Sequence, residues 1–371
     1  MLALLLASPG AASAATSLTI HVAPAVPVYG HTVVFSGHVT PQTAGEQVDL
    51  IADTGSGYAV VTSTTTAAGG TYSFSLAAKK PGSYAVQAPG ATSAAVALTL
   101  RPHMTARVRG LLYPGLPLYL RGRVRPAAAG TLKLHIGTHT WKVGVHANGT
   151  YAARLLTRAG GLHRARLQFV PRAGYAPRSL ARRYRIRTPN LSIGSYGRAV
   201  FALERRLHLL RYALRASNKF FGVDTYEAVL AFQKVHRMSR TGRIGDTVWG
   251  KLGRAKVPVA RHPSGSHIEV DKTRQVLFEV RRGHVVHVIH VSTGATGNTP
   301  VGTYHVYLKT PGLLPSGMYY SLFWHGAFAI HGYHSVPPWP ASHGCVRIPM
   351  WLAPGLYSRW GLGTRVYVYY S

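Results

Sequence analysis

SHGCVR, at residues 342–347, is the stretch that decides how the C-terminal third of this chain folds. Its cysteine, Cys345, is the only one in 371 residues, so a disulfide within the chain is excluded. A buried, inert thiol is one interpretation, because free cysteines are usually buried. A nucleophile is the other, and the neighbouring His343 and Gly344 favour it, because a thiol attacks acyl carbons only when a base or positive partner generates the thiolate.

Two histidines are candidates for the base that activates Cys345. His343 lies two positions before it and would share its face on an extended strand. His331 lies 345 − 331 = 14 residues upstream, and the proline-rich segment between them could return the chain so that His331 faces the thiol. No Asp or Glu follows Glu279, so a carboxylate that orients the base would have to come from an earlier strand.

Three upstream blocks accompany this stretch, namely VSTG at 291–294, TPVGTY at 299–304 and AIHGY at 329–333. Together with residues 342–348 they resemble the L,D-transpeptidase catalytic domain (YkuD-like) over about 105 residues. The resemblance implies a β-sandwich domain and a thiol-based acyl transfer on the stem peptides of peptidoglycan, without a cofactor. It also implies that Cys345 is the nucleophile and that His331 is the proton donor and acceptor, oriented by the carbonyl of Gly332.

Other residues of the motif are candidates for supporting roles. The amide of Gly344 suits an oxyanion donor, because glycine allows a close backbone approach. Arg347 could grip a substrate carboxylate through two hydrogen bonds, whereas His343 is expected to shape the loop. Further substrate-binding candidates are Gly332, Ser342, Tyr320 and Trp324, with Tyr319 beside them; for the aromatic residues, core packing is the equal alternative.

A metal site is an alternative because the chain has 20 histidines. His325, His331, His334 and His343 could be imagined around zinc. No HxxxH pair on a helix, second cysteine or nearby carboxylate supports such a site, so we expect none.

Residues 189–253 have helical periodicity. Val200, Leu203, Leu207 and Leu210 fall on one face of a first helix, and Asp224 is expected to cap a second. These residues resemble the three-helix peptidoglycan-binding domain, which implies binding to the cell-wall polymer. Residues 254–265 are predicted to be a linker to the catalytic domain at 266–371.

Residues 17–188 contain two copies of a β-rich unit. FSGHVTP around Gly37 recurs as LRGRVRP around Gly122, at an offset of 122 − 37 = 85. Short alternating runs with Gly and Pro between them predict two tandem Ig-like β-sandwiches, at 16–101 and 102–188. The chain is therefore predicted to be multidomain and mostly β, and the two modules are expected to act as spacers or adhesion modules.

Residues 1–15 have an apolar stretch and the small-residue site Ala12-Ser13-Ala14, which predict a signal peptide, truncated at its basic start, and export to the cell wall. No later stretch is apolar enough for a transmembrane span. The formal net charge of +32, from 42 Lys and Arg against 10 Asp and Glu, predicts adhesion to a polyanion. Anionic cell-wall polymers fit export, whereas no nucleic-acid recognition motif is present.

Three alternatives to cross-linking remain open. A carboxypeptidase or endopeptidase would use the same Cys-His pair and let water take the acyl group. A non-catalytic wall-binding protein would carry an inactive catalytic domain on its adhesive modules. Binding to nucleic acid through the positive charge would show a steep salt dependence, and it leaves the SHGCVR stretch unexplained.

Overall fold

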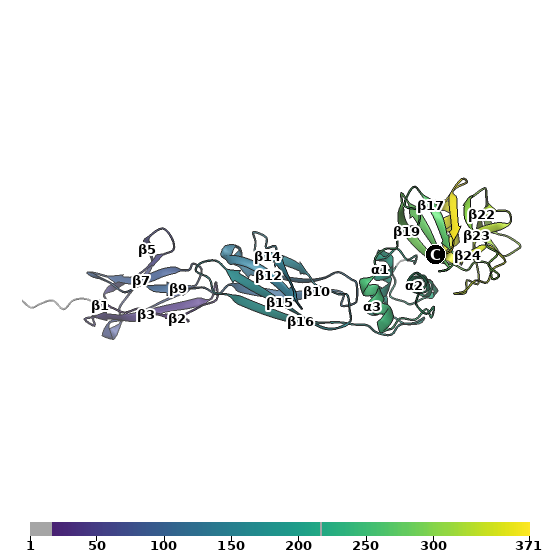
Figure 1. Cartoon of the computed structure of the whole chain (residues 1–371). Coiled ribbons are helices and arrows are strands. Elements are labelled where there is room, and N and C mark those ends of the chain that lie inside the picture. Colours follow the sequence, from purple (N-terminus) through teal and green to yellow (C-terminus); the bar gives the residue numbers. More distant parts are fainter. Residues whose placement is uncertain (1–16, 216) are drawn as a thin grey trace, which may run out of the picture. The chain divides into compact units, whose positions relative to one another are not determined.

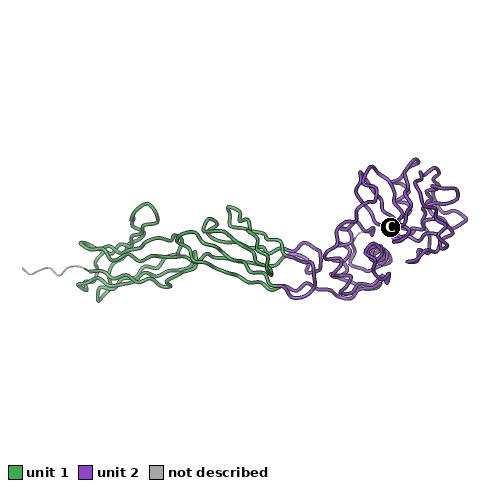
Figure 2. The backbone as a smooth tube through the Cα atoms, viewed as in Figure 1, with its two compact units in different colours: residues 1–109, 119–155, 164–183 green, residues 110–118, 156–163, 184–371 purple. Residues whose placement is uncertain are grey.

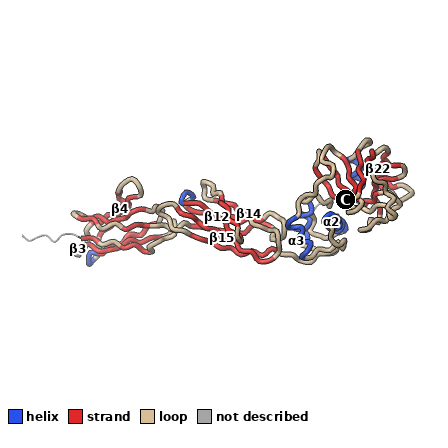
Figure 3. Tube along the Cα trace, in the orientation of Figure 1, coloured by secondary structure: helices blue, strands red, loops and turns tan. Residues whose placement is uncertain are grey.

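The computed structural model describes residues 17–215 and 217–371, so the predicted signal peptide at 1–15 lies outside the described residues. Strands predominate (Figure 1, Figure 3), and the predicted multidomain, mostly β fold is confirmed. The chain divides into two compact units (Figure 2): one ends at residue 109 and resumes at 119–155 and 164–183, and the other comprises 110–118, 156–163 and 184–371. No helix among the described residues is long and apolar enough to cross a membrane.

Each N-terminal module consists of two antiparallel sheets. In the first module, β3 lies between β1 and β2 and also pairs with β6, while the second sheet runs β5-β4-β7-β8 with β9 on β7. In the second module the sheets run β10-β11-β14 and β13-β12-β15-β16. The strands of the first module are β1 Ser17–Leu18, β2 His21–Ala23, β3 Thr32–Thr40, β4 Gln47–Asp53, β5 Tyr58–Thr65, β6 Thr71–Ala77, β7 Gly82–Ala88, β8 Ala91–Thr92 and β9 Val96–Leu98. Those of the second are β10 His103–Gly110, β11 Leu118–Arg125, β12 Gly130–Ile136, β13 His139–Val143, β14 Thr150–Arg154, β15 Gly161–Pro171 and β16 Arg178–Ile186.

The repeated glycines have the same structural role in both modules. Gly37 on β3 faces Tyr72 on β6, whose hydroxyl donates to the carbonyl of Thr19. A Cβ at Gly37 would lie 1.9 Å from that carbonyl oxygen. Gly122 repeats this arrangement, since its Cβ would lie 1.9 Å from the carbonyl of Thr105, which accepts the hydroxyl of the facing Tyr151. The sequence repeat therefore corresponds to the same contact between a glycine, a tyrosine and a backbone carbonyl in both modules.

The second unit contains the helices and the C-terminal sheets. Its helices are α1 Arg198–Leu209, α2 Val223–Val235, α3 Asp246–Arg254 and the short α4 Ala353–Arg359. One sheet runs β19-β18-β17-β25-β20 and the other β21-β22-β23-β24. Their strands are β17 His267–Asp271, β18 Val276–Arg281, β19 His284–His290, β20 Gly302–His305, β21 Leu308–Leu313, β22 Tyr319–His325, β23 Phe328–Tyr333, β24 Val346–Pro349 and β25 Arg365–Tyr369.

The helical bundle and the sheet β17–β19 share one hydrophobic core. Phe232 of α2 and Trp249 of α3 belong to the same buried cluster as Phe278 of β18 and Val288 of β19. Burying these faces against each other removes apolar surface from water, which is the main stabilising contribution to such packing. The bundle therefore packs directly on β18 and β19 within this unit.

Glu279 on β18 ties the end of α4 to the sheet. Its fully buried carboxylate accepts hydrogen bonds from Arg359 Nε and Nη2 (2.9 and 2.6 Å) and from Trp360 Nε1 (2.8 Å). Burial acts to raise the pKa of Glu279, but hydrogen bonds from His287 and Arg359 outweigh it and lower this pKa from 4.5 to about 2. The carboxylate therefore stabilises the fold fully above pH 4.5, and this contribution disappears as the pH falls toward 2.

We predict that E279Q lowers the free energy of unfolding of the second unit by about 3 kcal/mol at neutral pH, because Arg359 loses a buried partner. The loss should shrink between pH 4.5 and 2, where the wild-type carboxylate becomes protonated. Urea unfolding followed by tryptophan fluorescence measures this, since five of the six tryptophans lie in the second unit. E46Q, the same substitution in the first unit, is the control, and equal stability of E279Q and wild type would contradict the prediction.

Candidate functional site

The predicted catalytic residues lie at the parallel pair of strands β23 and β24. The register places His331 opposite Arg347 and Ile330 opposite Val346. Cys345 immediately precedes β24, so its neighbour on β23 is Ala329, whose amide lies 3.5 Å from Cys345 Sγ. Parallel pairing needs a crossover connection, and the proline-rich segment between the two strands supplies it.

Cys345 is half-buried beside the β22–β23 hairpin. Its Sγ lies 3.7 Å from the carbonyl oxygen of Ala327 and 4.0 Å from Met318 Sδ. Burial raises the pKa of the Cys345 thiol, whereas the Ala329 amide and the charge of Arg347 lower it. Because the net direction is upward, the thiol is protonated at neutral pH and needs a base to react.

His331 is buried and its imidazole is fixed by the backbone. Its Nδ1 lies 2.9 Å from the carbonyl oxygen of Gly332, which can only accept, so Nδ1 carries the proton and Nε2 has the free lone pair. Burial lowers the pKa of His331; the Gly332 hydrogen bond raises it, and Arg347 lowers it further. The imidazole is therefore neutral at pH 7 and able to take a proton.

Arg347 supplies the nearby positive charge. Its Cζ lies 4.1 Å from the centre of the Tyr333 ring, and that ring meets the His331 imidazole edge to face at 5.7 Å. The guanidinium favours the thiolate of Cys345 and the neutral form of His331. Arg347 thus acts electrostatically on both partners of the pair.

The loop before Cys345 is held by its own side chains. Ser342 is buried; its Oγ donates to the carbonyl of Cys345 at 2.6 Å and accepts from the amide of Gly344 at 3.0 Å. Gly344 has a φ of +140°, and a Cβ there would lie 2.0 Å from the Phe328 ring, so only glycine fits. The predicted oxyanion role of Gly344 remains a prediction, and it requires that Ser342 release this amide.

Two of the predicted substrate-binding residues, Trp324 and Ser342, are buried in the structure. Trp324 is 2% exposed and belongs to the core, so it leaves no surface for a substrate. Ser342 is buried as well and holds the loop instead of lining a cleft. Tyr320 packs edge to face against Tyr319 and Tyr357 at the margin of the core. His343 is exposed, and its carbonyl accepts from Asn298.

Several residues that stabilise the site through hydrogen bonds were not predicted from the sequence. Thr299 is fully buried, accepts from the Gly294 amide (2.9 Å) and donates to the carbonyl of Gly344 (2.7 Å). Thr299 lies in the TPVGTY block, and this motif is the sequence feature from which its role could have been predicted. His290 donates to the carbonyl of Val336 (2.7 Å) and Arg240 to that of Pro338 (2.7 Å), which fixes the crossover segment, and no local pattern marks either residue.

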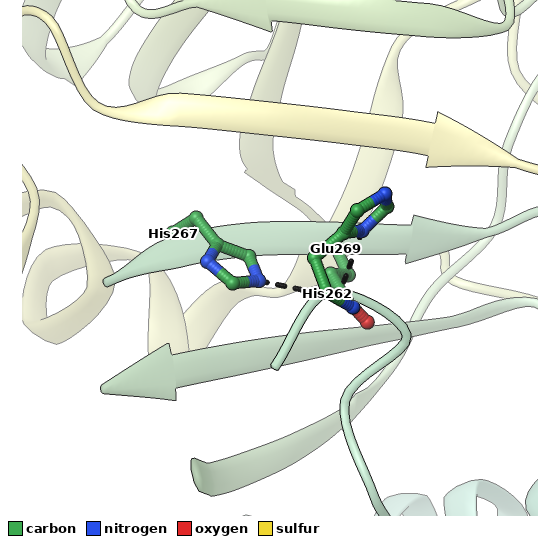
Figure 4. A group of neighbouring side chains, drawn as sticks. All are labelled: His262, His267 and Glu269. Atoms are coloured by element: carbon green, nitrogen blue, oxygen red, sulfur yellow. Dashed lines mark hydrogen bonds and ion pairs between the residues drawn. The ribbon is translucent and has the colours of Figure 1, made fainter. Parts of the chain in front are cut away.

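One group among the described residues brings metal-ligating atoms together, and it lies away from the predicted histidines. Figure 4 shows His262 and His267 around Glu269, with these atoms within 4.8 Å of one another. Oε1 of Glu269 already accepts from both imidazoles at 3.1 Å and from the amide of His262 at 2.7 Å. Hydrogen bonds thus account for the group, which anchors the incoming segment on β17.

A cleft of about 760 Å³ lies between the bundle and the catalytic sheets of the second unit. Asp224 and Glu227 of α2 line one side, and Tyr319, Tyr333 and Trp351 line the other. Tyr333 thus borders both this cleft and the Arg347 guanidinium.

Comparisons with known proteins agree with the two resemblances. Residues 265–368 match the family model described as the L,D-transpeptidase catalytic domain, and residues 196–252 match that of a peptidoglycan binding domain. Among curated proteins, the sequence has no match.

Solved structures of L,D-transpeptidases are similar to parts of the chain. One from Xylanimonas cellulosilytica is 34% identical, covers 49% of this chain and 98% of its own, and has a TM-score of 0.46. One from Mycobacterium tuberculosis is 20% identical, with 28% and 57% covered and a TM-score of 0.26. One from Mycobacterium smegmatis is 10% identical, with 71% and 99% covered and a TM-score of 0.26. All three TM-scores are below 0.5, so the assignment rests on the sequence matches.

The family models match the two segments that contain the helical bundle and the Cys345–His331 pair. Residues 265–368 therefore belong to the L,D-transpeptidase catalytic domain family, and a domain of a peptidoglycan-binding family, at residues 196–252, precedes them.

Proposed function

We propose that the protein is a cysteine-nucleophile L,D-transpeptidase that cross-links peptidoglycan stem peptides outside the cell membrane. The observation that carries this proposal is the parallel pairing of β23 with β24, which brings the protonated thiol of Cys345 beside Ala329, two residues before His331. The imidazole of His331 is neutral, and its Nδ1 is fixed on the Gly332 carbonyl. The family match of residues 265–368 supports the substrate class. The predicted signal peptide and the peptidoglycan-binding match support an exported, wall-associated protein.

In the first step, His331 Nε2 takes the proton from the Cys345 thiol while the thiolate attacks an amide carbonyl of the donor stem peptide. A C–S bond forms and the C–N bond breaks, and the leaving amine receives the proton from His331. The chain now carries a thioester. No cofactor is needed, because every proton is exchanged between these groups and the substrate.

In the second step, an amine of a neighbouring stem attacks the thioester. His331 takes a proton from the attacking amine, the C–N bond forms, and Cys345 leaves as a thiolate that regains a proton. If water attacks instead, the product is a shortened stem, and the enzyme is a carboxypeptidase. Arg347 is proposed to bind a carboxylate of the donor as well as to bias the Cys345–His331 pair.

We predict that wild-type protein mixed with a tetrapeptide donor gains the mass of the donor minus that of the released amino acid, and that C345A gains none, because alanine has no nucleophile. Intact-protein mass spectrometry detects the adduct, and chromatography of the peptides separates a cross-linked dimer from a shortened monomer. A wild-type chain that never gains mass would overturn the proposed chemistry. A shortened monomer without dimer would assign the hydrolytic reaction instead.

We predict that H331Q slows acylation of Cys345 about 10²- to 10⁴-fold, the usual contribution of a general base. In wild type the acidic limb of the pH–rate profile should lie below pH 6.5, because burial and Arg347 lower the pKa of His331. R347Q removes the charge and should move this limb to higher pH.

R347K is the matched control, because it keeps the charge and should leave the acidic limb near its wild-type position. The measurement is the first-order rate of adduct formation at low donor concentration across the pH range. An acidic limb that does not move in R347Q would show that Arg347 does not set the ionisation of His331.

A further inference from the structure

The cleft between the bundle and the catalytic sheets gathers negative charge in a strongly basic chain. Seven of the ten acids lie in the second unit, and the folded core accounts for four of them: Glu204, Glu269, Asp271 and Glu279 are at most 1% exposed. Of the remaining three, Asp224 and Glu227 line this one cleft. Arg215, which also lines it, is the cationic side chain on the bundle side, so two carboxylates face one guanidinium.

Both carboxylates are held in place by neighbouring groups. Glu227 Oε2 accepts from Trp351 Nε1 at 2.7 Å, and Asp224 Oδ2 accepts from the backbone amide of Arg215 at 3.2 Å. The Arg215 guanidinium lies 5.3 Å from the centre of the Trp351 ring. Neither carboxylate forms a salt bridge among the described residues, so neither is already paired with a cation of the protein.

The cleft borders the reaction centre through two aromatic residues. Tyr333 lies under the Arg347 guanidinium and meets the His331 ring. Tyr319 follows Met318, whose Sδ is 4.0 Å from Cys345 Sγ. A ligand in the cleft would therefore approach the thioester from the side of Tyr319 and Tyr333, and aromatic faces beside carboxylates suit a cationic group on an apolar stem.

We propose that this cleft is the binding site for the acyl acceptor, and that Asp224 and Glu227 of the bundle recognise it as a peptide carrying a primary ammonium group. This inference rests on the proposed function, since it needs a Cys345 thioester for the amine to attack. Burial raises the pKa of Glu227 to about 7, with Asp224 adding to the rise and the Trp351 hydrogen bond opposing it, so the carboxylate is charged at mildly alkaline pH. The bundle would then select the acceptor in addition to anchoring the enzyme on the wall.

The chemistry requires the acceptor to lose its charge before it attacks. The ammonium is drawn to the carboxylates, gives up one proton to solvent, and presents a neutral amine to the thioester carbonyl. The C–N bond forms, the C–S bond breaks, and His331 returns the amine's second proton to the Cys345 thiolate. Asp224 and Glu227 are thus positioning residues that raise the local concentration of amine over water.

The test separates acylation from transfer. The full chain is acylated with the tetrapeptide donor at mildly alkaline pH, and the thioester is then offered the side-chain amine of Nα-acetyl-lysine amide, which is cationic, or hydroxylamine, which is neutral. We expect E227Q and D224N to acylate at the wild-type rate but to lower the ratio of lysine transfer to hydrolysis about five- to tenfold. Transfer to hydroxylamine should remain unchanged.

D246N is the matched control, because it removes the third of these acids from the same bundle but away from this cleft. High salt should reduce the difference between wild type and E227Q, since the attraction is electrostatic. An unchanged ratio in both E227Q and D224N, or an equal loss with hydroxylamine, would overturn the inference while leaving the proposed function intact. A wild-type chain that forms no acyl-enzyme would overturn both.

Discussion

The arrangement of the second unit depends on one buried cation. Lys234, near the end of α2, is 2% exposed, and its ammonium donates to the carbonyls of Gln275 (3.0 Å) and Val291 (2.8 Å) and to His290 Nδ1 (2.6 Å). Burial and the charge of Arg240 lower the pKa of Lys234, whereas three hydrogen-bond acceptors around its Nζ favour the ammonium form. His290 accepts from Lys234 because its Nε2 donates to Val336, which leaves Nδ1 without a proton. One ammonium thus fixes the bundle, the sheet and the segment that leads to Cys345.

This constraint explains why the bundle cannot be treated as a tethered module. A buried ammonium that loses any one acceptor costs several kcal/mol, so α2 and the β18–β19 edge must keep one relative position. Arg240 adds a second polar contact, to the carbonyl of Pro338. The crossover segment between His331 and Cys345 is therefore held from the bundle side, and the geometry of the nucleophile depends on residues outside the catalytic domain.

The local part of the candidate site could be predicted from the sequence, because its residues lie in short motifs. The motifs at residues 329–333 and 342–348 predicted that the proline-rich segment returns the chain toward His331, and the structure has this segment connect the parallel strands β23 and β24. The Gly332 carbonyl beside His331 was expected from the family resemblance. Trp324 was harder to assign, since an aromatic residue on a strand gives the same signal whether it faces a cleft or a core. The cleft itself could not be predicted, because Asp224 and Trp351 lie 351 − 224 = 127 residues apart and only tertiary packing joins them.

Side chains of opposite charge lie near Tyr333. The Arg347 guanidinium packs on this ring, and its proposed ligand is a carboxylate of the donor peptide. Asp224 and Glu227 line the cleft that Tyr333 also borders, and their proposed ligand is a cation. A chain with a net charge of +32 repels ammonium groups over most of its surface, so a local pair of carboxylates has a larger effect here than in a neutral protein. Water carries no net charge, so the two carboxylates do not concentrate it in the cleft as they do an ammonium group. In the proposed mechanism, Asp224 and Glu227 therefore favour an amine over water at the thioester, and such a preference distinguishes a transferase from a hydrolase built on the same cysteine and histidine.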